Sequence, residues 1–185
     1  MRNIFFGLLF TLCGSAQAQE LKVIAFDCFG TVFNFADLPL QEKRDYIRQL
    51  KQTPWKPLEL PASWETMPAH PDSREGLERL RRHYVVVTCS NGPAPLLVKM
   101  SRNAGINWDM VLPLELIPAY KPDPQTYEMI AKVLGVLPSE VLMVTGNEGS
   151  PDLVVPRTIG MRVMRIRGEP GTPQTIGELA DLLEP

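Results

Sequence analysis

Polar side chains that can do covalent chemistry follow three apolar runs of this sequence, each where the run ends. They are Asp27 after residues 21–26, Ser90 and Asn91 after residues 84–88, and Asn147 after residues 141–145. A carboxylate at such a point can attack an electrophilic carbon or phosphorus and form a covalent ester, which divides one difficult displacement into two easier ones. Gly30 lies in the turn after Asp27, where backbone amides can face an anion. Taken alone, Asp27 would more simply cap that turn, so its interpretation depends on the groups around it.

Lys121 is the second group with chemical potential. A Lys met in isolation is most often a solvated loop residue. Here Pro122 and Pro124 stiffen the loop just before a predicted helix, so the ammonium is presented from a preset backbone. A fixed cation near Asp27 would keep that carboxylate ionised and lower its pKa.

Four short apolar runs predict the strands that would position these groups. Continuous apolar runs of this length are typical of parallel strands covered on both faces. Helical periodicity lies between them, and the alternation predicts a doubly wound, Rossmann-like α/β parallel sheet, in which ligands bind outside the carboxyl ends of the strands. The predicted strands are 21–26, 84–88, 141–145 and 162–166, and the predicted helices between them are 73–82, 95–104 and 124–134.

A proline-rich stretch interrupts this alternation. Five prolines lie between residues 39 and 68, a sixth is Pro71, and a single helix-like stretch covers residues 40–51. We interpret residues 37–70 as a small inserted cap or flap over the strand ends. Residues 19–185, this insertion included, have the length of one domain.

Composition and charge argue against nucleic acid as a partner. The chain has 185 residues, of which 44% are hydrophobic, and a net charge of −2. Acidic and basic residues are spread along it, so no basic face indicates nucleic acid binding.

The first 18 residues have the pattern of a secretory signal peptide. Arg2 precedes an apolar run over residues 4–12, and Ala16 and Ala18 supply small residues at a cleavage site. The run is too short to anchor the chain in a bilayer of about 30 Å hydrocarbon. We therefore expect cleavage after Ala18, no stable membrane anchor, and a periplasmic or secreted protein. A mis-assigned start is the alternative, which the absence of another Met before Met67 disfavours.

Four segments together resemble the haloacid dehalogenase superfamily, from residue 21 to about residue 166. They are FDCFGT (26–31), TCSNG (88–92), YKPDPQTYE (120–128) and VTGNEGSPD (144–152). The resemblance implies a hydrolase with Asp27 as nucleophile and Ser90 as an anion-binding residue. It also implies that Lys121 neutralises the nucleophile or the leaving group, and that Thr31 orients the loop by hydrogen bonds.

Phe29 indicates which branch of the superfamily the chain resembles. Phosphatases of the superfamily place a second Asp two residues after the nucleophile, to protonate the leaving oxygen. Phe29 stands there and cannot donate a proton, so phosphoryl transfer would lose the factor of about 10²–10⁴ that acid catalysis contributes. The L-2-haloacid dehalogenase branch has an aromatic residue at this place, because a halide leaves without protonation. The chain resembles that branch, which displaces halide through an aspartyl ester.

The resemblance extends to the remaining site residues. Asn147 stands where phosphatases carry a metal-binding Asp, and its lack of charge weakens a Mg²⁺ site, so no cofactor is expected. Asp152 would position Lys121 and the hydrolytic water. If a metal were bound, Asp27 and Asp152 would hold it, together with Glu148. The substrate-binding set implied for a small anionic substrate is Thr31, Ser90, Asn91, Tyr127, Thr145 and Asn147.

Two features depart from the dehalogenase pattern and keep other hypotheses open. Asn147 and Asp152 are five positions apart, as in phosphatases, and the cap is short. Arg44 and Arg48 are the candidates for a halide-binding Arg, although a solvated helix face explains them equally well. The second hypothesis is a Mg²⁺-dependent phosphohydrolase with a degraded general acid. The third is a secreted module of the same fold that binds without turnover.

Overall fold

A computed structural model describes residues 20–52, 56–168 and 170–184. Its four strands form one parallel sheet in the order β2-β1-β3-β4. The strands are β1 (Val23–Phe26), β2 (Val85–Thr88), β3 (Val141–Thr145) and β4 (Arg162–Arg165). Because β1 lies between β2 and β3, the polar residues that follow these three strands meet at one edge of the sheet. The predicted doubly wound α/β fold is confirmed.

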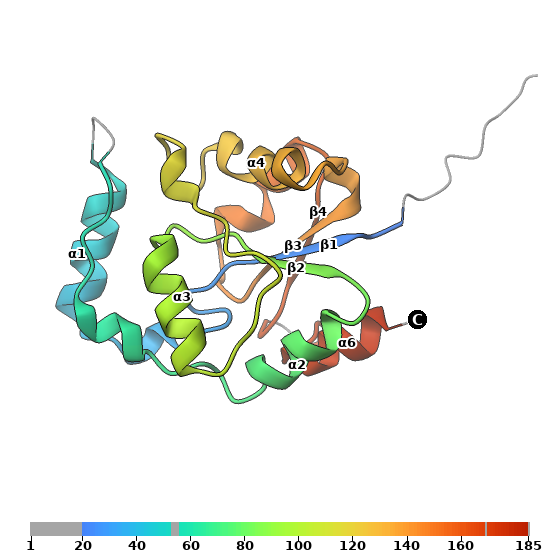
Figure 1. The fold of residues 1–185 in the computed structure, drawn as a ribbon, viewed down its shortest axis with the longest axis horizontal. Coiled ribbons are helices and arrows are strands. Elements are labelled where there is room, and N and C mark those ends of the chain that lie inside the picture. Colours follow the sequence, from blue (N-terminus) through green and yellow to red (C-terminus); the bar gives the residue numbers. More distant parts are fainter. Residues whose placement is uncertain (1–19, 53–55, 169, 185) are drawn as a thin grey trace, which may run out of the picture.

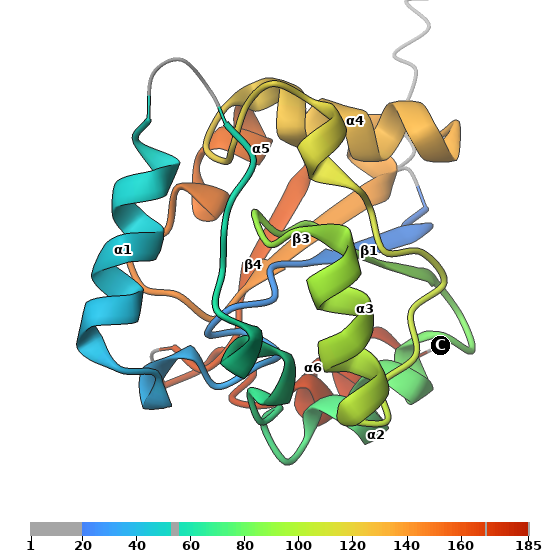
Figure 2. The ribbon, with the colours of Figure 1, turned by 60° about the vertical axis from the view of Figure 1, so that its left-hand side comes forward.

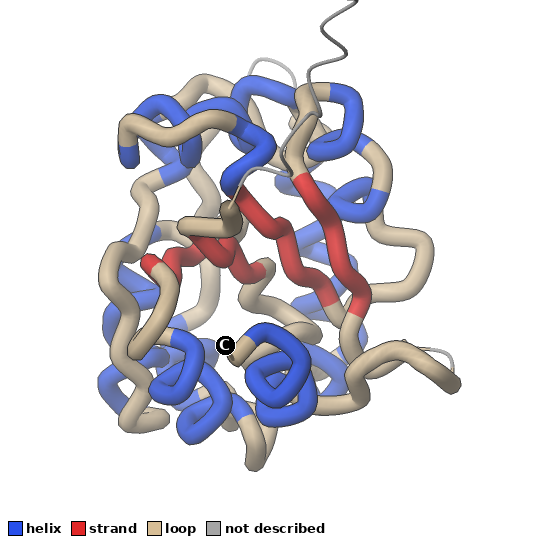
Figure 3. The backbone as a smooth tube through the Cα atoms, turned by 90° about the vertical axis from the view of Figure 1, so that its right-hand side faces the viewer, coloured by secondary structure: helices blue, strands red, loops and turns tan. Residues whose placement is uncertain are grey.

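Helices cover both faces of this sheet (Figures 1 and 3). Successive side chains of a strand point to opposite faces, so Ile24 and Phe26 of β1 enter one apolar core while Val23 and Ala25 enter the other. The first core contains residues of α2, α3 and α6, and the second contains residues of α4 and α5. The bounds are α2 (Ser73–Leu80), α3 (Ala94–Asn103), α4 (Pro124–Leu134), α5 (Val155–Thr158) and α6 (Ile176–Leu183).

Local signals explain why α4 occupies the predicted residues. Pro124 opens the helix, where its missing N–H is not needed, and the Asp123 side chain accepts a hydrogen bond from the Gln125 amide as N-cap. Gly135 ends it with a φ of 65°, a left-handed conformation that glycine adopts without strain. Lys121 therefore lies in a loop just ahead of a firmly bounded helix.

Residues 37–52 lie beyond the carboxyl ends of the strands and contain α1 (Leu40–Leu50), which stands apart from the sheet in Figures 1 and 2. A short 3-10 helix, Ala62–Thr66, follows it. Trp64 is fully buried and its indole N–H donates to Glu42 of α1 at 2.7 Å, so Trp64 holds α1 in place. Trp55, the other tryptophan considered for this role, lies outside the described residues.

None of the helices in the described part of the chain has the length and apolar character needed to cross a lipid bilayer. The predicted signal peptide, residues 1–18, lies outside the described residues, so it and the periplasmic or secreted location stay predictions.

Candidate active site

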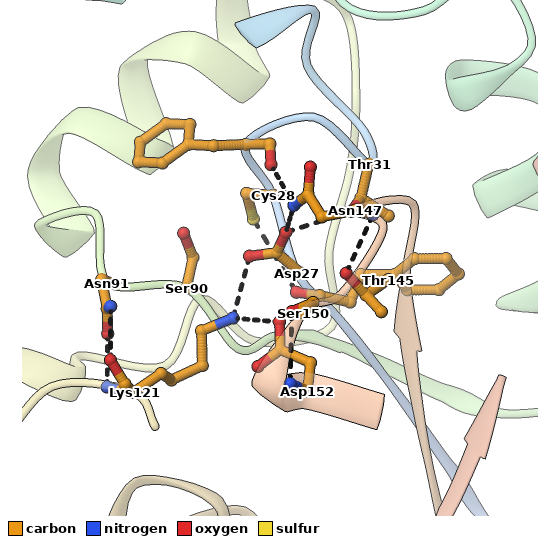
Figure 4. A network of polar contacts seen from close by, with 12 residues as sticks. Asp27, Cys28, Thr31, Ser90, Asn91, Lys121, Thr145, Asn147, Ser150 and Asp152 are labelled. Atoms are coloured by element: carbon orange, nitrogen blue, oxygen red, sulfur yellow. Dashed lines mark hydrogen bonds and ion pairs between the residues drawn. The ribbon is translucent and has the colours of Figure 1, made fainter. Parts of the chain in front are cut away.

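Three donors hold the carboxylate of Asp27 in one orientation, directly after β1 (Figure 4). The Lys121 ammonium donates to Oδ1 at 2.9 Å. Thr31 Oγ1 and Asn147 Nδ2 donate to Oδ2 at 3.1 and 2.8 Å. The Asp27 side chain is 9% exposed. A carboxylate in this position is oriented for attack and largely shielded from water.

Lys121 bridges Asp27 and a second carboxylate, Asp152. Its Nζ lies 2.9 Å from Asp152 Oδ2 as well as from Asp27 Oδ1. The side chains of Lys121 and Asp152 are 8% and 5% exposed. Tyr127 donates its hydroxyl hydrogen bond to Asp152 Oδ1 at 2.5 Å. The backbone of Lys121 is fixed by Asn91, whose side chain accepts from the Lys121 amide at 2.7 Å and donates to its carbonyl at 3.2 Å.

Burial and charge act in opposite directions on these groups. Burial raises the pKa of Asp27, the neighbouring Lys121 lowers it, and Asp152 raises it again, with the net direction upward. The lowering that we predicted from Lys121 is present but outweighed, because the sequence pattern carried no measure of desolvation. For Lys121, burial lowers the pKa, but Asp152 and Asp27 outweigh it, so its pKa lies well above the usual value and the ammonium stays charged.

The loops after β1 and β3 interlock through small residues. Gly30 has a φ of 82°, and a Cβ placed there would come within 2.3 Å of Asn147 Oδ1. The Gly146 amide donates to Thr31 Oγ1 at 2.8 Å, and the Asn147 amide donates to Thr145 Oγ1 at 3.3 Å. Gly30 is therefore required both by its backbone conformation and by the space that Asn147 occupies.

A pocket of about 520 Å³ opens over Asp27. Six of the nine predicted site residues line it: Asp27, Asn91, Lys121, Tyr127, Asn147 and Asp152. Thr31, Ser90 and Thr145 do not line it, and each is fully buried. They lie below the pocket and hold neighbouring groups; Ser90 Oγ, for example, accepts from the Gly92 amide at 3.3 Å.

The pocket also contains residues that the sequence interpretation did not name. The second wall comes from α1, the residue that follows it and Phe35 in the loop before it, so this helix of the predicted insertion covers one side of the site. Arg44 and Arg48 are exposed on α1, Arg48 pairs with Asp45 at 2.7 Å, and neither lines this pocket. The residues that form this wall are Phe35, Tyr46, Ile47, Leu50 and Lys51. In the sequence, the apolar side of α1 was the signal from which this wall could have been predicted.

The residues around Asp27 do not fit a divalent metal ion. Asn147 Nδ2 lies between two acceptors, Asp27 Oδ2 at 2.8 Å and the Phe29 carbonyl at 2.9 Å, so its donor end faces the carboxylate. Lys121 takes the place between Asp27 and Asp152. Mg²⁺ needs oxygen ligands in near-octahedral geometry. No group of three or more His, Cys, Asp or Glu suited to a metal occurs among the described residues.

We expect Asn147→Asp to create a cation requirement. The new carboxylate would face Asp27 and the Phe29 carbonyl without a donor, costing about 1–3 kcal/mol of the free energy of unfolding. Added Mg²⁺ should raise the melting temperature of this variant and leave that of the wild type unchanged. Asn103→Asp is the matched control, because the exposed Asn103 also donates to a carbonyl, at 2.9 Å, but at a distant site. A wild type stabilised by Mg²⁺ to the same extent would contradict the argument.

Comparisons with known proteins show what the chain is similar to. A model of the haloacid dehalogenase-like hydrolases matches residues 40–145, more than half of the chain. The match includes Ser90 and Lys121, whereas Asp27 and Asp152 lie outside it.

Two bacterial enzymes are similar in sequence. An (S)-2-haloacid dehalogenase 4A of Burkholderia cepacia is 30% identical over 118 residues, covering 62% of this chain and 50% of that enzyme. An (S)-2-haloacid dehalogenase of Xanthobacter autotrophicus is 24% identical over 176 residues, covering 69% of this chain and 68% of that enzyme. The match thus spans half the length of the first relative.

The fold is also that of a solved dehalogenase. An L-2-haloacid dehalogenase from Xanthobacter autotrophicus gives a TM-score of 0.72 at 19% identity, covering 88% of this chain and 98% of that one. At this identity the likeness establishes the fold alone.

Proposed function

Because this chain belongs to the haloacid dehalogenase-like hydrolase family, we propose that it displaces halide from a small 2-haloacid through an ester on Asp27. The observation that carries the proposal is the composition of the pocket over Asp27. The nucleophile and Lys121 form its floor, and the position two residues after Asp27 holds an aromatic ring, Phe29, in place of an acid. A halide is a leaving group that needs no proton. The two curated relatives are dehalogenases of this type.

The first step forms a bond between an Asp27 oxygen and C2 of the substrate, while the carbon–halogen bond breaks and its electron pair leaves with the halide. Lys121, Thr31 and Asn147 hold the attacking carboxylate in place. Lys51 is a second cation in the pocket wall, and with Lys121 it favours an anionic substrate.

The second step hydrolyses the ester. Water attacks the Asp27 carbonyl carbon and gives one proton to Asp152, which returns it to the departing alkoxide of the 2-hydroxyacid. The remaining proton leaves to solvent as Asp27 becomes a carboxylate again. Lys121 and Tyr127 keep Asp152 oriented for this exchange.

Halide release is the direct test of the proposal. We expect chloride to appear from L-2-chloropropionate without added metal and to persist in the presence of chelator. The five-residue spacing of Asn147 and Asp152 favours the second candidate, a metal-dependent phosphohydrolase. Hydrolysis of p-nitrophenyl phosphate that chelator abolishes would support that candidate instead. Folded protein that hydrolyses neither compound would favour a binding module without turnover.

The pH dependence should reflect the environment of Asp27. Only the ionised carboxylate attacks, so activity falls as pH drops through the pKa of Asp27. Because that pKa is raised in the folded protein, we expect the acid limb of kcat/KM above 3.8, the usual Asp value. Thr31→Val removes a donor to the carboxylate and should move the limb to higher pH, whereas Thr31→Ser should retain it. A wild-type limb at or below 3.8 would contradict this assignment.

A further inference from the structure

Tyr46 is a pocket residue for which the proposed mechanism has no role. It lies on α1, is 8% exposed, and lines the pocket that contains Asp27. Three aromatic rings fix its orientation. Its centroid is 5.7 Å from that of Phe29 in an edge-to-face arrangement at 88°, 5.8 Å from that of Phe35 and 5.5 Å from that of Trp64.

The hydroxyl group of Tyr46 forms no hydrogen bond with any residue that the structure describes. The other three tyrosines of the chain differ in this respect. Tyr127 donates to Asp152, Tyr84 donates to the Leu183 carbonyl at 2.5 Å, and Tyr120 donates to the Lys56 carbonyl. Because Tyr46 lines the pocket and its hydroxyl has no partner among the described residues, that hydroxyl is available to a ligand bound there.

The surroundings of the Tyr46 hydroxyl indicate that it binds an anionic part of a ligand as a hydrogen-bond donor. Burial, and then the charge of Asp27, raise the pKa of Tyr46 well above its usual range, so the phenol stays neutral and donates without losing its proton. Tyr46 contacts Phe29, the residue two positions after the nucleophile, among apolar rings where a hydrogen bond to a developing anion is strengthened. Lys51, which directly follows α1, is the other residue on this wall of the pocket that could bind an anion, and it is exposed to water.

We propose that the Tyr46 hydroxyl donates a hydrogen bond to the departing halide. The inference rests on the proposed function and adds the leaving-group site to it. The halide takes the electron pair of the carbon–halogen bond and Tyr46 keeps its proton, while Phe29 and Phe35 line the pocket beside the contact. The residue thus stabilises charge that develops only as the bond breaks, which accelerates the reaction without tightening substrate binding.

The dependence on the halogen tests this role. Hydrogen-bond acceptance weakens from chloride to bromide to iodide. We therefore expect Tyr46→Phe to lower kcat for 2-chloropropionate by about 10- to 100-fold, with a clearly smaller loss for 2-bromopropionate and the smallest for 2-iodopropionate. KM should change little. Tyr84→Phe, which also loses a hydroxyl hydrogen bond but lies outside the pocket, should show no dependence on the halogen. An equal loss for all three halogens would assign Tyr46 a packing role and overturn the proposal.

Bromide binding gives a readout that does not need turnover. Crystals of the wild type soaked in bromide should show the ion at the Tyr46 hydroxyl, and crystals of Tyr46→Phe should not. In solution, bromide should inhibit the wild type more strongly than Tyr46→Phe. If Lys51→Ala removed the bromide and Tyr46→Phe did not, Lys51 would be the halide ligand and the proposal would be wrong. A wild type that binds bromide at Tyr46 but hydrolyses no haloacid would contradict only the proposed function.

Discussion

Asp27→Asn is expected to abolish halide release, with kcat lower by about 10⁴-fold or more, the scale on which removal of a covalent nucleophile acts in other hydrolases. The amide has nearly the shape of the carboxylate but lacks its nucleophilic oxygen charge. The measurement is chloride release from L-2-chloropropionate. Asp181→Asn is the matched control, because Asp181 is 67% exposed and pairs with Arg79 away from the pocket, so this variant should retain full activity.

Isotope transfer tells covalent catalysis by Asp27 apart from direct attack by water. In a single turnover in H₂¹⁸O, the ester route places the label in the Asp27 carboxylate and unlabelled oxygen in the product. Mass spectrometry of the peptide containing Asp27 measures this. Label found directly in the 2-hydroxyacid after one turnover would exclude Asp27 as the nucleophile, even if Asp27→Asn were inactive.

Lys121→Met is expected to have the largest effect on stability. The substitution leaves Asp27 and Asp152 buried beside each other without the cation that lies 2.9 Å from both. Removing one partner of a buried ion pair costs about 3–5 kcal/mol of the free energy of unfolding. Activity should be lost as well. Urea unfolding at several pH values measures the cost, and Lys99→Met, which breaks an exposed pair with Glu65, should cost about 0–1 kcal/mol.

The pH dependence of this loss has a defined sign. The pKa of Lys121 is raised on folding, so its stabilising effect is complete below 10.5, its usual value, and disappears only as pH rises through the higher folded value. In Lys121→Met, burial and Asp152 raise the pKa of Asp27 and Lys121 no longer lowers it, so the variant regains stability as pH falls and that carboxyl takes up a proton. Adding Asp152→Asn should relieve part of the cost at neutral pH. A loss that is the same at pH 5 and pH 8 would show that charge is not its cause.

The two carboxylates and the lysine form one buried unit, to which the proposed mechanism assigns the reaction. Lys121 is held at its backbone by Asn91 and at its ammonium by Asp27 and Asp152. Tyr127 gives Asp152 a further donor. Each of the three charged groups is held by at least two hydrogen-bond partners, so a cluster buried in this way keeps its geometry.

The elements of the sheet followed from local properties of the chain. The apolar run 141–145 is β3 without change, and the predicted helix 124–134 is α4 without change, because Asp123, Pro124 and Gly135 give it unambiguous ends. The other predicted strands and helices shifted at their ends by one or two residues. By contrast, α5 and α6 were not predicted. The apolar residues of α6 become buried only because the helix packs against α2 and the sheet, and such tertiary packing cannot be read from the local sequence.

Sequence alone determined which polar side chains stand at the strand ends, since a buried strand and the turn after it are set by neighbouring residues. Asp27, Asn91 and Asn147 meet because parallel strands place their carboxyl ends at one edge of the sheet. Tertiary structure alone decided what surrounds them. It brought α1 and Tyr46 over the pocket, left Arg44 and Arg48 outside it, and placed Lys121 between two carboxylates. It also raised the pKa of Asp27, because desolvation and charge depend on distances between segments that no local pattern encodes.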